Sequence, residues 1–309
     1  MKADIDNYIV STIEKGDVFT FDGLDQHIKD ADHRMQSFPK FIEERISARS
    51  DIRESSKKHQ WKIIGSLMEF GRIINFSDLT RSNIIAYDDF LQTKGIRQST
   101  IHSYHKILKT YINEAIRRGI MPSSPYADVK IKRGESECSR WLTEAEFRKI
   151  KDMLLPTEAL RIVRDMFVVQ CLTGLSYADL QKADFSHPQE DNGRYYLTGV
   201  RVKTGKVFCT VLLPEVMEIL SMYSDKLPKI SNHLYNTRLK ILAKHAGIDK
   251  PIASHWGRRT CGMLLLNRGV SIEIVAKVLG HSSIRITESA YARILNKSVI
   301  DVVSDKMRL

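Results

Sequence analysis

The sequence predicts a mainly α-helical fold in two domains, with one small antiparallel β-sheet in the second domain. Three observations predict it. Apolar residues recur at helical spacing along most of the 309-residue chain. A single β-branched and aromatic stretch, residues 194–213, interrupts that pattern and contains the turn pair Thr204-Gly205. A segment of turn-forming and basic residues, 121–140, divides the helical pattern into two parts and is predicted to be the interdomain linker.

The first domain, residues 38–120, is predicted to be a small bundle of four amphipathic helices joined by short loops. Good N-cap residues and one terminal glycine mark its helices, which are predicted to start near Ser37, Ser55, Thr80 and Ser99, the last ending at Gly119. The apolar stripe of the second helix is predicted to be Trp61, Ile64, Leu67 and Met68. Before the bundle, residues 1–37 are acidic and poorly patterned, and Val18-Phe19-Thr20-Phe21 is predicted to be a short strand or a docking segment.

The second domain, residues 141–309, is predicted to be mixed but mostly helical. A capping box, Thr143 with Glu146, opens it. Residues 194–213 are predicted to form a short hairpin or a three-stranded sheet. Helices are then predicted near residues 214–224, 231–246, 255–268, 271–279 and 283–294. The apolar segment Val299–Val303 is predicted to dock on a neighbouring protomer.

The charge of the chain is strongly positive and unevenly distributed. The net charge is +11 and the isoelectric point is about 9.4, which suits a polyanionic partner such as nucleic acid. Residues 1–55 carry 8 lysines and arginines against 12 acidic residues, whereas residues 56–134 carry 14 against 6. The surface that faces double-stranded DNA is therefore predicted to begin after the first fifty residues.

The cysteines and the N-terminus bear on the compartment. The four cysteines are scattered without a C-x-x-C pair, which predicts neither a zinc site nor a disulfide framework and favours a reducing cytoplasm. No apolar run approaches the roughly 18 residues of a membrane span. The first residues also lack the pattern of a signal peptide. A membrane partner is not expected.

Candidate catalytic residues gather near the C-terminus. His255 and Arg258 are three apart, so both can face one phosphate from the same side of a helix. His281 follows Leu279-Gly280, and Tyr291 comes ten residues later. A tyrosine can attack a phosphodiester when cations stabilise the charge that develops. Each residue alone fits an ordinary helix position, but together these residue types suit phosphoryl transfer.

These motifs resemble the tyrosine recombinase (phage integrase) family. The resemblance covers roughly residues 38–295 and includes Thr173-Gly174-Leu175-Ser176-Tyr177 and the Lys203-Thr204 hairpin. It implies a SAM-like four-helix core-binding domain followed by the catalytic domain. It also implies cleavage through a covalent 3′-phosphotyrosine, with no metal, nucleotide or other cofactor.

The resemblance assigns roles to individual residues. Tyr291 is the expected nucleophile, Arg258 and His281 the expected phosphate ligands, and His255 a phosphate ligand or the group that handles the tyrosine proton. Lys203 is expected to protonate the leaving 5′-oxygen, with Lys206 as its rival three residues away. Asp179 is expected to brace the cationic site.

One position departs from the family. Most members carry an arginine after Thr-Gly-Leu as the first phosphate clamp, whereas this chain has Ser176, a form shared with some integrases of mobile elements. Arg164, twelve residues upstream on the preceding helix, is predicted to substitute for it. The alternative is that the clamp is absent and activity is reduced.

The two-domain layout predicts a clamp around DNA, with basic side chains on phosphates. The predicted contacts are Lys106, Lys109, Arg117, Arg118, Lys130, Lys132 and Arg133. The leading hypothesis is a site-specific recombinase that catalyses integration, excision or inversion as a homotetramer on two DNA sites, with possible DNA-bending accessory proteins. Two alternatives stay open: a type IB topoisomerase-like strand transferase, and a recombinase-derived DNA-binding protein with weakened catalysis.

Overall fold

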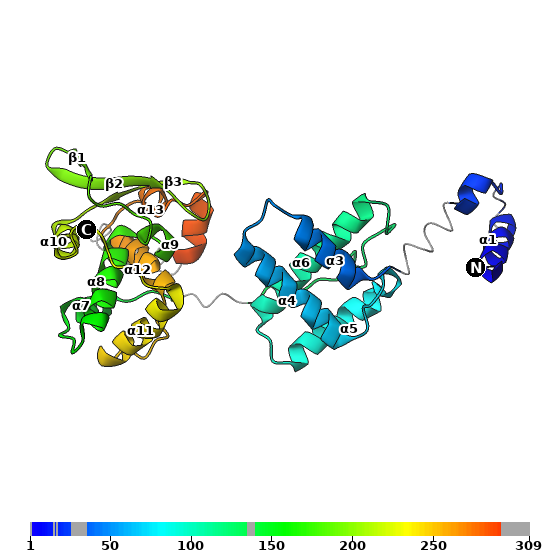
Figure 1. The fold of residues 1–309 in the computed structure, drawn as a ribbon, viewed down its shortest axis with the longest axis horizontal. Helices are drawn as coiled ribbons and strands as arrows, with labels where there is room; N and C mark the ends of the chain where they lie inside the picture. The colour runs from blue at the N-terminus through cyan, green and yellow to red at the C-terminus, as the bar shows by residue number, and fades with distance from the viewer. Residues whose placement is uncertain (1, 15, 17, 26–35, 135–139, 292–309) are drawn as a thin grey trace, which may run out of the picture. The chain divides into compact units, whose positions relative to one another are not determined.

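The structure is a computed structural model that describes residues 2–14, 16, 18–25, 36–134 and 140–291. The chain divides into two compact units, Met1–Ser136 and Glu137–Leu309, each with its own hydrophobic core (Figure 1). Both units are mainly helical, and the second contains one three-stranded antiparallel sheet. The predicted fold class is therefore confirmed. None of the helices in the described ranges is long and apolar enough to cross a membrane.

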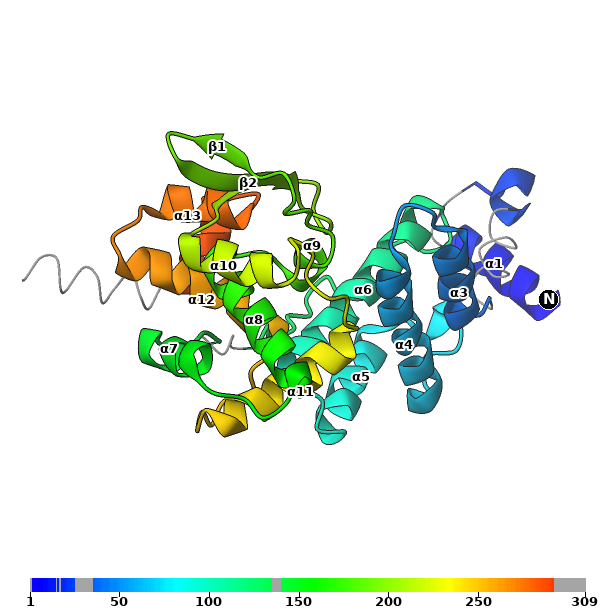
Figure 2. The same cartoon turned by 60° about the vertical axis from the view of Figure 1, so that its left-hand side comes forward.

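Unit 1 contains the predicted helical bundle (Figure 2). Its elements are α1 (Lys2–Glu14), α3 (Phe38–Ala48), α4 (Glu54–Phe70), the 3-10 helix η1 (Phe76–Asp78), α5 (Arg81–Thr93) and α6 (Gln98–Arg117). Helix α4 packs against α3 and α6, and α5 packs against α6. The bundle core is formed by their apolar faces, including Ile42, Leu67, Tyr87 and Leu108, all fully buried.

Local signals set the boundaries of these helices. Ser37 accepts a hydrogen bond from the backbone of Lys40 at the start of α3, and Thr80 does the same for Asn83 in α5. Gly71 ends α4 in the left-handed region. The stripe predicted for α4 is partly wrong, because Ile63, Ile64 and Leu67 are buried. Trp61 and Met68 face outward and are 39% and 72% exposed.

The first part of the segment predicted to be a linker, residues 121–134, packs with unit 1. Met121 and Tyr126 are buried in the core of unit 1, and Val129 and Ile131 pack against it. The hydroxyl of Tyr126 and Nδ1 of the buried His105 of α6 share a hydrogen bond of 2.7 Å. Residues 121–134 therefore extend the bundle, and the boundary between the units falls between Ser136 and Glu137.

Two expectations concern the ends of the chain. The acidic N-terminal stretch contains helix α1, and residues 21–25 are also helical, so the predicted strand at Val18–Phe21 is wrong. In the described ranges no strand lies beside it, and a short apolar segment gains little from an extended conformation without one. The docking segment Val299–Val303 lies outside the described residues, as do the last residues of the helix predicted over 283–294.

Unit 2 is built around two long helices that pack closely on each other, α8 (Glu158–Thr173) and α12 (Ser254–Asn267). Around them lie α7 (Glu144–Asp152), α9 (Tyr177–Leu180), α10 (Pro214–Met222), α11 (Asn232–His245) and α13 (Ile272–Leu279). Residues 284–291 are also helical. The predicted capping box at Thr143 is present, with Glu146 closing it.

The sheet lies at one edge of unit 2 and consists of β1 (Gln189–Asp191), β2 (Arg194–Val200) and β3 (Val207–Val211) in the order β1-β2-β3 (Figure 1). Val200 pairs with Val207, so the turn that joins β2 to β3 contains Lys203 and Gly205. Helix α13 packs against β3. The first strand, β1, lies before the predicted range. Its side chains are polar and exposed, so the β-branched and aromatic pattern did not indicate it. This arrangement brings the β2–β3 turn to the end of α13.

Candidate active site

A pocket of about 270 Å³ collects the C-terminal motifs of unit 2. Its walls come from the β2–β3 turn, the start of α12, the end of α13 and the helical residues 284–291. The lining residues are Arg201, Lys203, Thr204, His255, Arg258, Arg259, Gly280, His281, Ser282, Ile286, Ala290 and Tyr291. Five of the six predicted catalytic residues therefore meet in one place, although they span almost ninety positions of sequence.

Helix α12 positions Arg258 deep in this pocket, where the residue is 5% exposed. Its Nη1 donates to the carbonyl oxygen of Gly174 at 2.8 Å, and its Nη2 donates to the carbonyl oxygen of Leu279. Burial and the neighbouring Arg201 lower the pKa of Arg258 to about 10, so it remains a cation at neutral pH. The guanidinium is thus held rigidly by two helix ends.

Two glycines make this arrangement possible. Gly174 caps α8 with φ of 71°, and a Cβ there would lie 2.8 Å from the Leu279 side chain. Gly280 ends α13 with φ of 56°, and a Cβ there would lie 2.8 Å from Cδ of Arg201. Left-handed backbone and close approach both require glycine. The glycines of the Thr-Gly-Leu and Leu-Gly-His motifs therefore let helix ends reach the arginines.

The two histidines of the pocket are neutral at pH 7. Partial removal from water and the cations Arg259, Arg258 and Lys203 lower the pKa of His255 to about 4, although this side chain retains solvent access. Burial and nearby arginines lower the pKa of His281 to about 4 as well. Nδ1 of His281 is 2.8 Å from the hydroxyl of the buried Thr287. If that hydroxyl donates, the remaining ring proton lies on Nε2 and can be donated to a phosphate.

We expect acid to destabilise the fold partly through His281. Its folded-state pKa of about 4 lies below the unfolded value of about 6.5, so the unfolded chain binds the proton first as the pH falls. The His281 contribution to stability is intact above pH 6.5. It is lost as the pH falls from 6.5 to 4, by roughly 1 kcal/mol between pH 7 and pH 5.5. Urea unfolding at both pH values measures it. His281→Asn should lose less stability than the wild type over this interval, and equal losses would contradict the assignment.

Tyr291 is almost fully buried, with 1% of its surface exposed. Its ring lies 6.1 Å from that of Trp141, and a Cβ built on Gly262 of α12 would overlap the Tyr291 hydroxyl. Burial, and secondarily Cys261, raise the pKa of Tyr291, while Arg258 and Arg259 oppose the shift. The phenol is therefore protonated at neutral pH and needs a proton acceptor when it reacts.

The structure separates the two lysines of the β2–β3 turn. Lys203 lines the pocket, whereas Lys206 is not among the lining residues. The carbonyl of Lys206 accepts a 2.8 Å hydrogen bond from the backbone of Arg201, which closes the turn. Lys203 is thus positioned to reach a ligand in the pocket, as the sequence interpretation favoured.

Arg164 is the one predicted catalytic residue that the structure does not bring to the pocket. Its Nε donates to Asp165 at 2.8 Å and its Nη1 to the carbonyl of Met153 at 2.9 Å. Tyr223 holds the other oxygen of Asp165 at 2.7 Å. These contacts tie Arg164 to the loop before α8, away from the end of α8 that carries Gly174. Counting helical turns could not reveal this, because the direction depends on side-chain partners.

Ser176 and Asp179 lie just beyond the C-terminal end of α8. Ser176 is the N-cap of α9, and its hydroxyl donates to a carboxylate oxygen of Asp179 at 2.6 Å. Asp179 also accepts from the backbone of Val202 at 2.8 Å and pairs with Nε of Arg201 at 3.0 Å. Asp179 therefore braces an arginine of the cationic site.

Arg201 is a site residue that sequence reasoning missed. It directly precedes the turn that carries Lys203 and reads there as one more basic residue of a hairpin. In the structure it is 7% exposed and lines the pocket beside Arg258. The only available sequence signal was its proximity to Lys203, two residues away.

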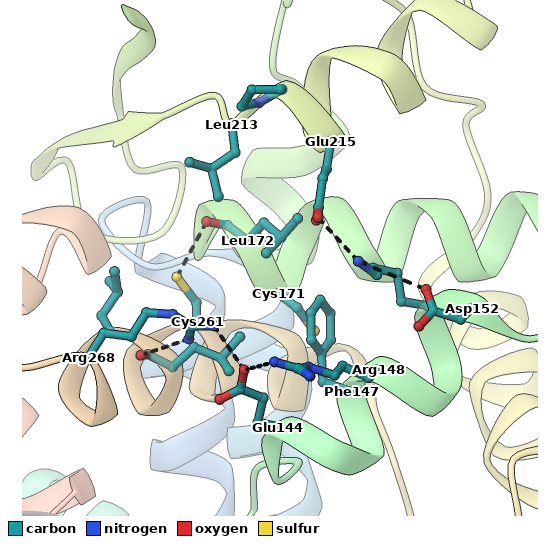
Figure 3. Close-up of a pocket in the computed structure, with 14 residues that line it drawn as sticks. Glu144, Phe147, Arg148, Asp152, Cys171, Leu172, Leu213, Glu215, Cys261 and Arg268 are labelled. Atoms are coloured by element: carbon teal, nitrogen blue, oxygen red, sulfur yellow. Dashed lines mark hydrogen bonds and ion pairs between the residues drawn. The ribbon is translucent and has the colours of Figure 1, made fainter.

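A larger pocket of about 700 Å³ lies where α7, α8, α12 and the start of α10 meet (Figure 3). Its charged residues are already paired with one another. Glu144 contacts Arg148 at 2.8 Å and Arg268 at 3.1 Å, and Lys151 contacts Glu215 at 3.2 Å. Because these cations are neutralised within the protein, this pocket is poorly suited to a phosphate, and the smaller one is the candidate active site.

The predicted DNA contacts of unit 1 fall into two groups. Lys106, Arg117, Lys130, Lys132 and Arg133 are exposed. Lys109 lies over the ring of Tyr126 at 4.6 Å, and Arg118 pairs with Glu114 at 3.0 Å. Two further lysines of α4, Lys58 and Lys62, are exposed on a helix that contacts α6 and were not predicted. Within unit 1, exposed cations therefore lie on two adjoining helices and on the segment that follows them.

Family models match both units of the chain. A model described as the phage integrase SAM-like domain matches residues 37–132, and one described as the phage integrase family matches residues 140–297. A SAM-like helical domain followed by an integrase catalytic domain is the domain order of the site-specific recombinases. The chain belongs to the phage integrase family.

Curated relatives and solved structures extend the match. The chain is 25% identical over 221 residues to the tyrosine recombinase of Thermosipho africanus, covering 67% of this chain and 76% of that protein. It is also 25% identical over 243 residues to tyrosine recombinase XerD of Listeria innocua, covering 72% and 82%. The integrase of the Tn1549 transposon, solved with transposon right-end DNA, has a similar fold. Its TM-score is 0.71 at 15% identity, covering 87% of this chain and 100% of that one.

Proposed function

We propose that this chain is a site-specific tyrosine recombinase that cuts and rejoins double-stranded DNA through a covalent 3′-phosphotyrosine. The observation that carries the proposal is the convergence of Tyr291 with Arg258, His281, His255 and Lys203 in one pocket of a phage integrase family member. A buried phenol surrounded by positive charge suits attack on a phosphodiester, whose transition state gains negative charge on its oxygens.

The reaction is a transesterification. The Tyr291 oxygen forms a bond to phosphorus while the bond from phosphorus to the 5′-oxygen breaks. The protein becomes linked to the 3′-phosphate and a 5′-hydroxyl is released. Because one phosphodiester replaces another, the bond energy is retained, and religation by the reverse step needs no nucleotide. Arg258 and His281 bind the non-bridging oxygens, as their donors and charge allow.

Two protons must move in this step. The phenol loses one, and His255 is neutral at pH 7 because its pKa is about 4, so its ring nitrogen can accept it. Arrival of the phosphate anion raises the basicity of that histidine. The leaving 5′-oxygen gains a proton from Lys203, which the turn between β2 and β3 holds at the pocket.

Unit 1 supplies contacts to the DNA backbone. Exposed cations on α4 and α6 and on residues 130–133 can neutralise phosphates, which gives affinity and register rather than sequence specificity. The relatives whose structures match include integrases solved with DNA. By the same chemistry, the partner of this chain is a double-stranded DNA site.

The proposed number of protomers follows from the number of DNA strands that are cut. Exchange between two duplexes requires four strands to be cut, and each protomer carries one Tyr291. A homotetramer on two DNA sites, with DNA-bending accessory proteins where a site must be folded back, therefore fits integration, excision or inversion.

A suicide substrate tests the proposed function. A duplex selected for binding from a random library is nicked close to the cleavage position, so that the short 5′-hydroxyl fragment diffuses away and religation fails. The wild type should accumulate a covalent adduct through the 3′-phosphate at the cut, equally well in EDTA, because side chains supply the cations. Tight binding of the duplex without adduct would contradict the proposal.

A further inference from the structure

We propose that Arg201 supplies the phosphate clamp that Ser176 cannot, and that Ser176 acts instead as a positioning residue through Asp179. The inference deepens the proposed function and rests on it. It assigns to a turn residue the role expected of an arginine 25 positions earlier in the chain. Its basis is the contact network that joins α9, the β2–β3 turn and the end of α13.

The first step concerns where Arg201 lies. It lines the same pocket as Arg258, His281 and Tyr291. Its Nη1 donates to the carbonyl oxygen of Leu279 at 2.5 Å, and Nη2 of Arg258 donates to that same oxygen. Two guanidinium groups that share one carbonyl are held side by side at the C-terminal end of α13. A phosphate in the pocket can then be gripped by both.

The second step concerns what orients it. Asp179 pairs with Nε of Arg201 at 3.0 Å, and Ser176 donates to the same carboxylate oxygen at 2.6 Å. Because the neighbouring Val202 donates its backbone N–H to the other oxygen at 2.8 Å, the carboxylate also grips the turn itself. The chain from Ser176 to Asp179 to Arg201 holds the guanidinium in place by charge rather than by a hydrogen bond, since Nε of the buried Arg201 has no hydrogen-bond partner among the described residues.

The third step is a charge balance. Arg201, Arg258 and Asp179 are 7%, 5% and 4% exposed, so two buried cations share one buried carboxylate. Purely structural ion pairs in protein interiors are compensated, because an unmatched buried charge is costly. The excess of one positive charge at the pocket wall is what a site for a phosphate anion requires. Arg164, by contrast, is balanced by Asp165 at 2.8 Å.

The test compares single-turnover cleavage of the suicide substrate by Arg201→Ala, Arg201→Lys and the matched control Arg164→Ala. Each is also run on a duplex whose scissile phosphate is a methylphosphonate, in which a neutral methyl group replaces one charged oxygen. Arg201→Ala should cleave the phosphodiester on the order of 100-fold more slowly than the wild type. On one methylphosphonate diastereomer the difference in cleavage rate between the wild type and Arg201→Ala should fall below about tenfold, because the negative charge that the clamp would bind is absent. Arg164→Ala should match the wild type.

Loss of Arg201 leaves Asp179 buried without its ion-pair partner, so Arg201→Ala is also made together with Asp179→Asn. Thermal unfolding and DNA binding verify that the compared proteins are folded. A loss below tenfold on the phosphodiester, or an equal loss on both substrates, would overturn the inference. If the wild type cleaves neither neutral diastereomer, Arg201→Lys is compared with Arg201→Ala on the natural phosphodiester. A cleavage rate at least tenfold higher for Arg201→Lys supports the clamp, and equal rates for the two variants overturn it. If the wild type and Arg201→Ala form the adduct at the same rate, the clamp role of Arg201 is refuted and the recombinase function stands. If the wild type forms no adduct, the recombinase function itself is refuted.

Discussion

Replacing Tyr291 with phenylalanine should abolish the covalent protein–DNA adduct and leave binding of the target duplex nearly unchanged. The substitution deletes one hydroxyl, which is the proposed nucleophile, and none of the cations that contact phosphates. Loss of a nucleophile costs on the order of 10⁴-fold or more in rate. Denaturing gels of the suicide-substrate reaction measure the adduct, and a mobility shift under native conditions measures binding.

The structure supplies a fold check and a control for this variant. Phenylalanine keeps the ring that packs near Trp141, so the melting temperature should stay close to that of the wild type. Tyr195 is another tyrosine of the same unit, 40% exposed on β2, and Tyr195→Phe should form adduct at the wild-type rate. An adduct that persists in Tyr291→Phe would show that another residue attacks the phosphate.

Replacing Arg258 with lysine should slow cleavage on the order of 100-fold to 1000-fold, the cost of losing one preorganised transition-state donor. Lysine keeps a positive charge, but it cannot reach Gly174 and Leu279 as the planar guanidinium does and still face a phosphate. One backbone carbonyl is also left without its donor, which should lower the free energy of unfolding by about 1–3 kcal/mol. Single-turnover cleavage and urea unfolding measure the two effects separately.

Arg268 provides the matched control for Arg258. It follows the same helix α12 but pairs with Glu144 at 3.1 Å beside the larger pocket. Arg268→Lys should therefore cleave within about twofold of the wild type, since exposed ion pairs contribute little. A comparable loss in both variants would mean that the smaller pocket is not the site of chemistry.

Much of the helical architecture could be predicted because its signals are local. Thr80 and Thr143 accept backbone hydrogen bonds three residues ahead, and Gly119 follows the last turn of α6. A cap acts within one turn of its own helix, so a window of a few residues contains the information. The spacing of His255 and Arg258 on one helix face is equally local.

The errors have a common physical cause. Trp61 and Met68 are apolar and lie on α4, yet which face of an apolar helix is buried depends on the helices packed against it. The predicted strand at Val18–Phe21 has no partner strand among the residues that the structure describes. Arg164 lies on the predicted helix but is drawn to Asp165 and Met153. In each case the outcome depends on which partners the folded chain brings to the side chain or segment, and the spacing of apolar or basic residues does not reveal them.

The sequence by itself determined the fold class, most helix boundaries and five residues of the candidate site, because caps, periodicity and the spacing of Tyr291 from His281 are properties of short stretches. Only the tertiary structure decided which arginine stands beside Arg258. Arg201 meets the carbonyl of Leu279 across 78 positions of sequence, and Asp179 reaches the backbone of Val202 across 23. Such pairings form when β2, α9 and α13 pack together, and the free energy that selects them belongs to that packing rather than to any local pattern.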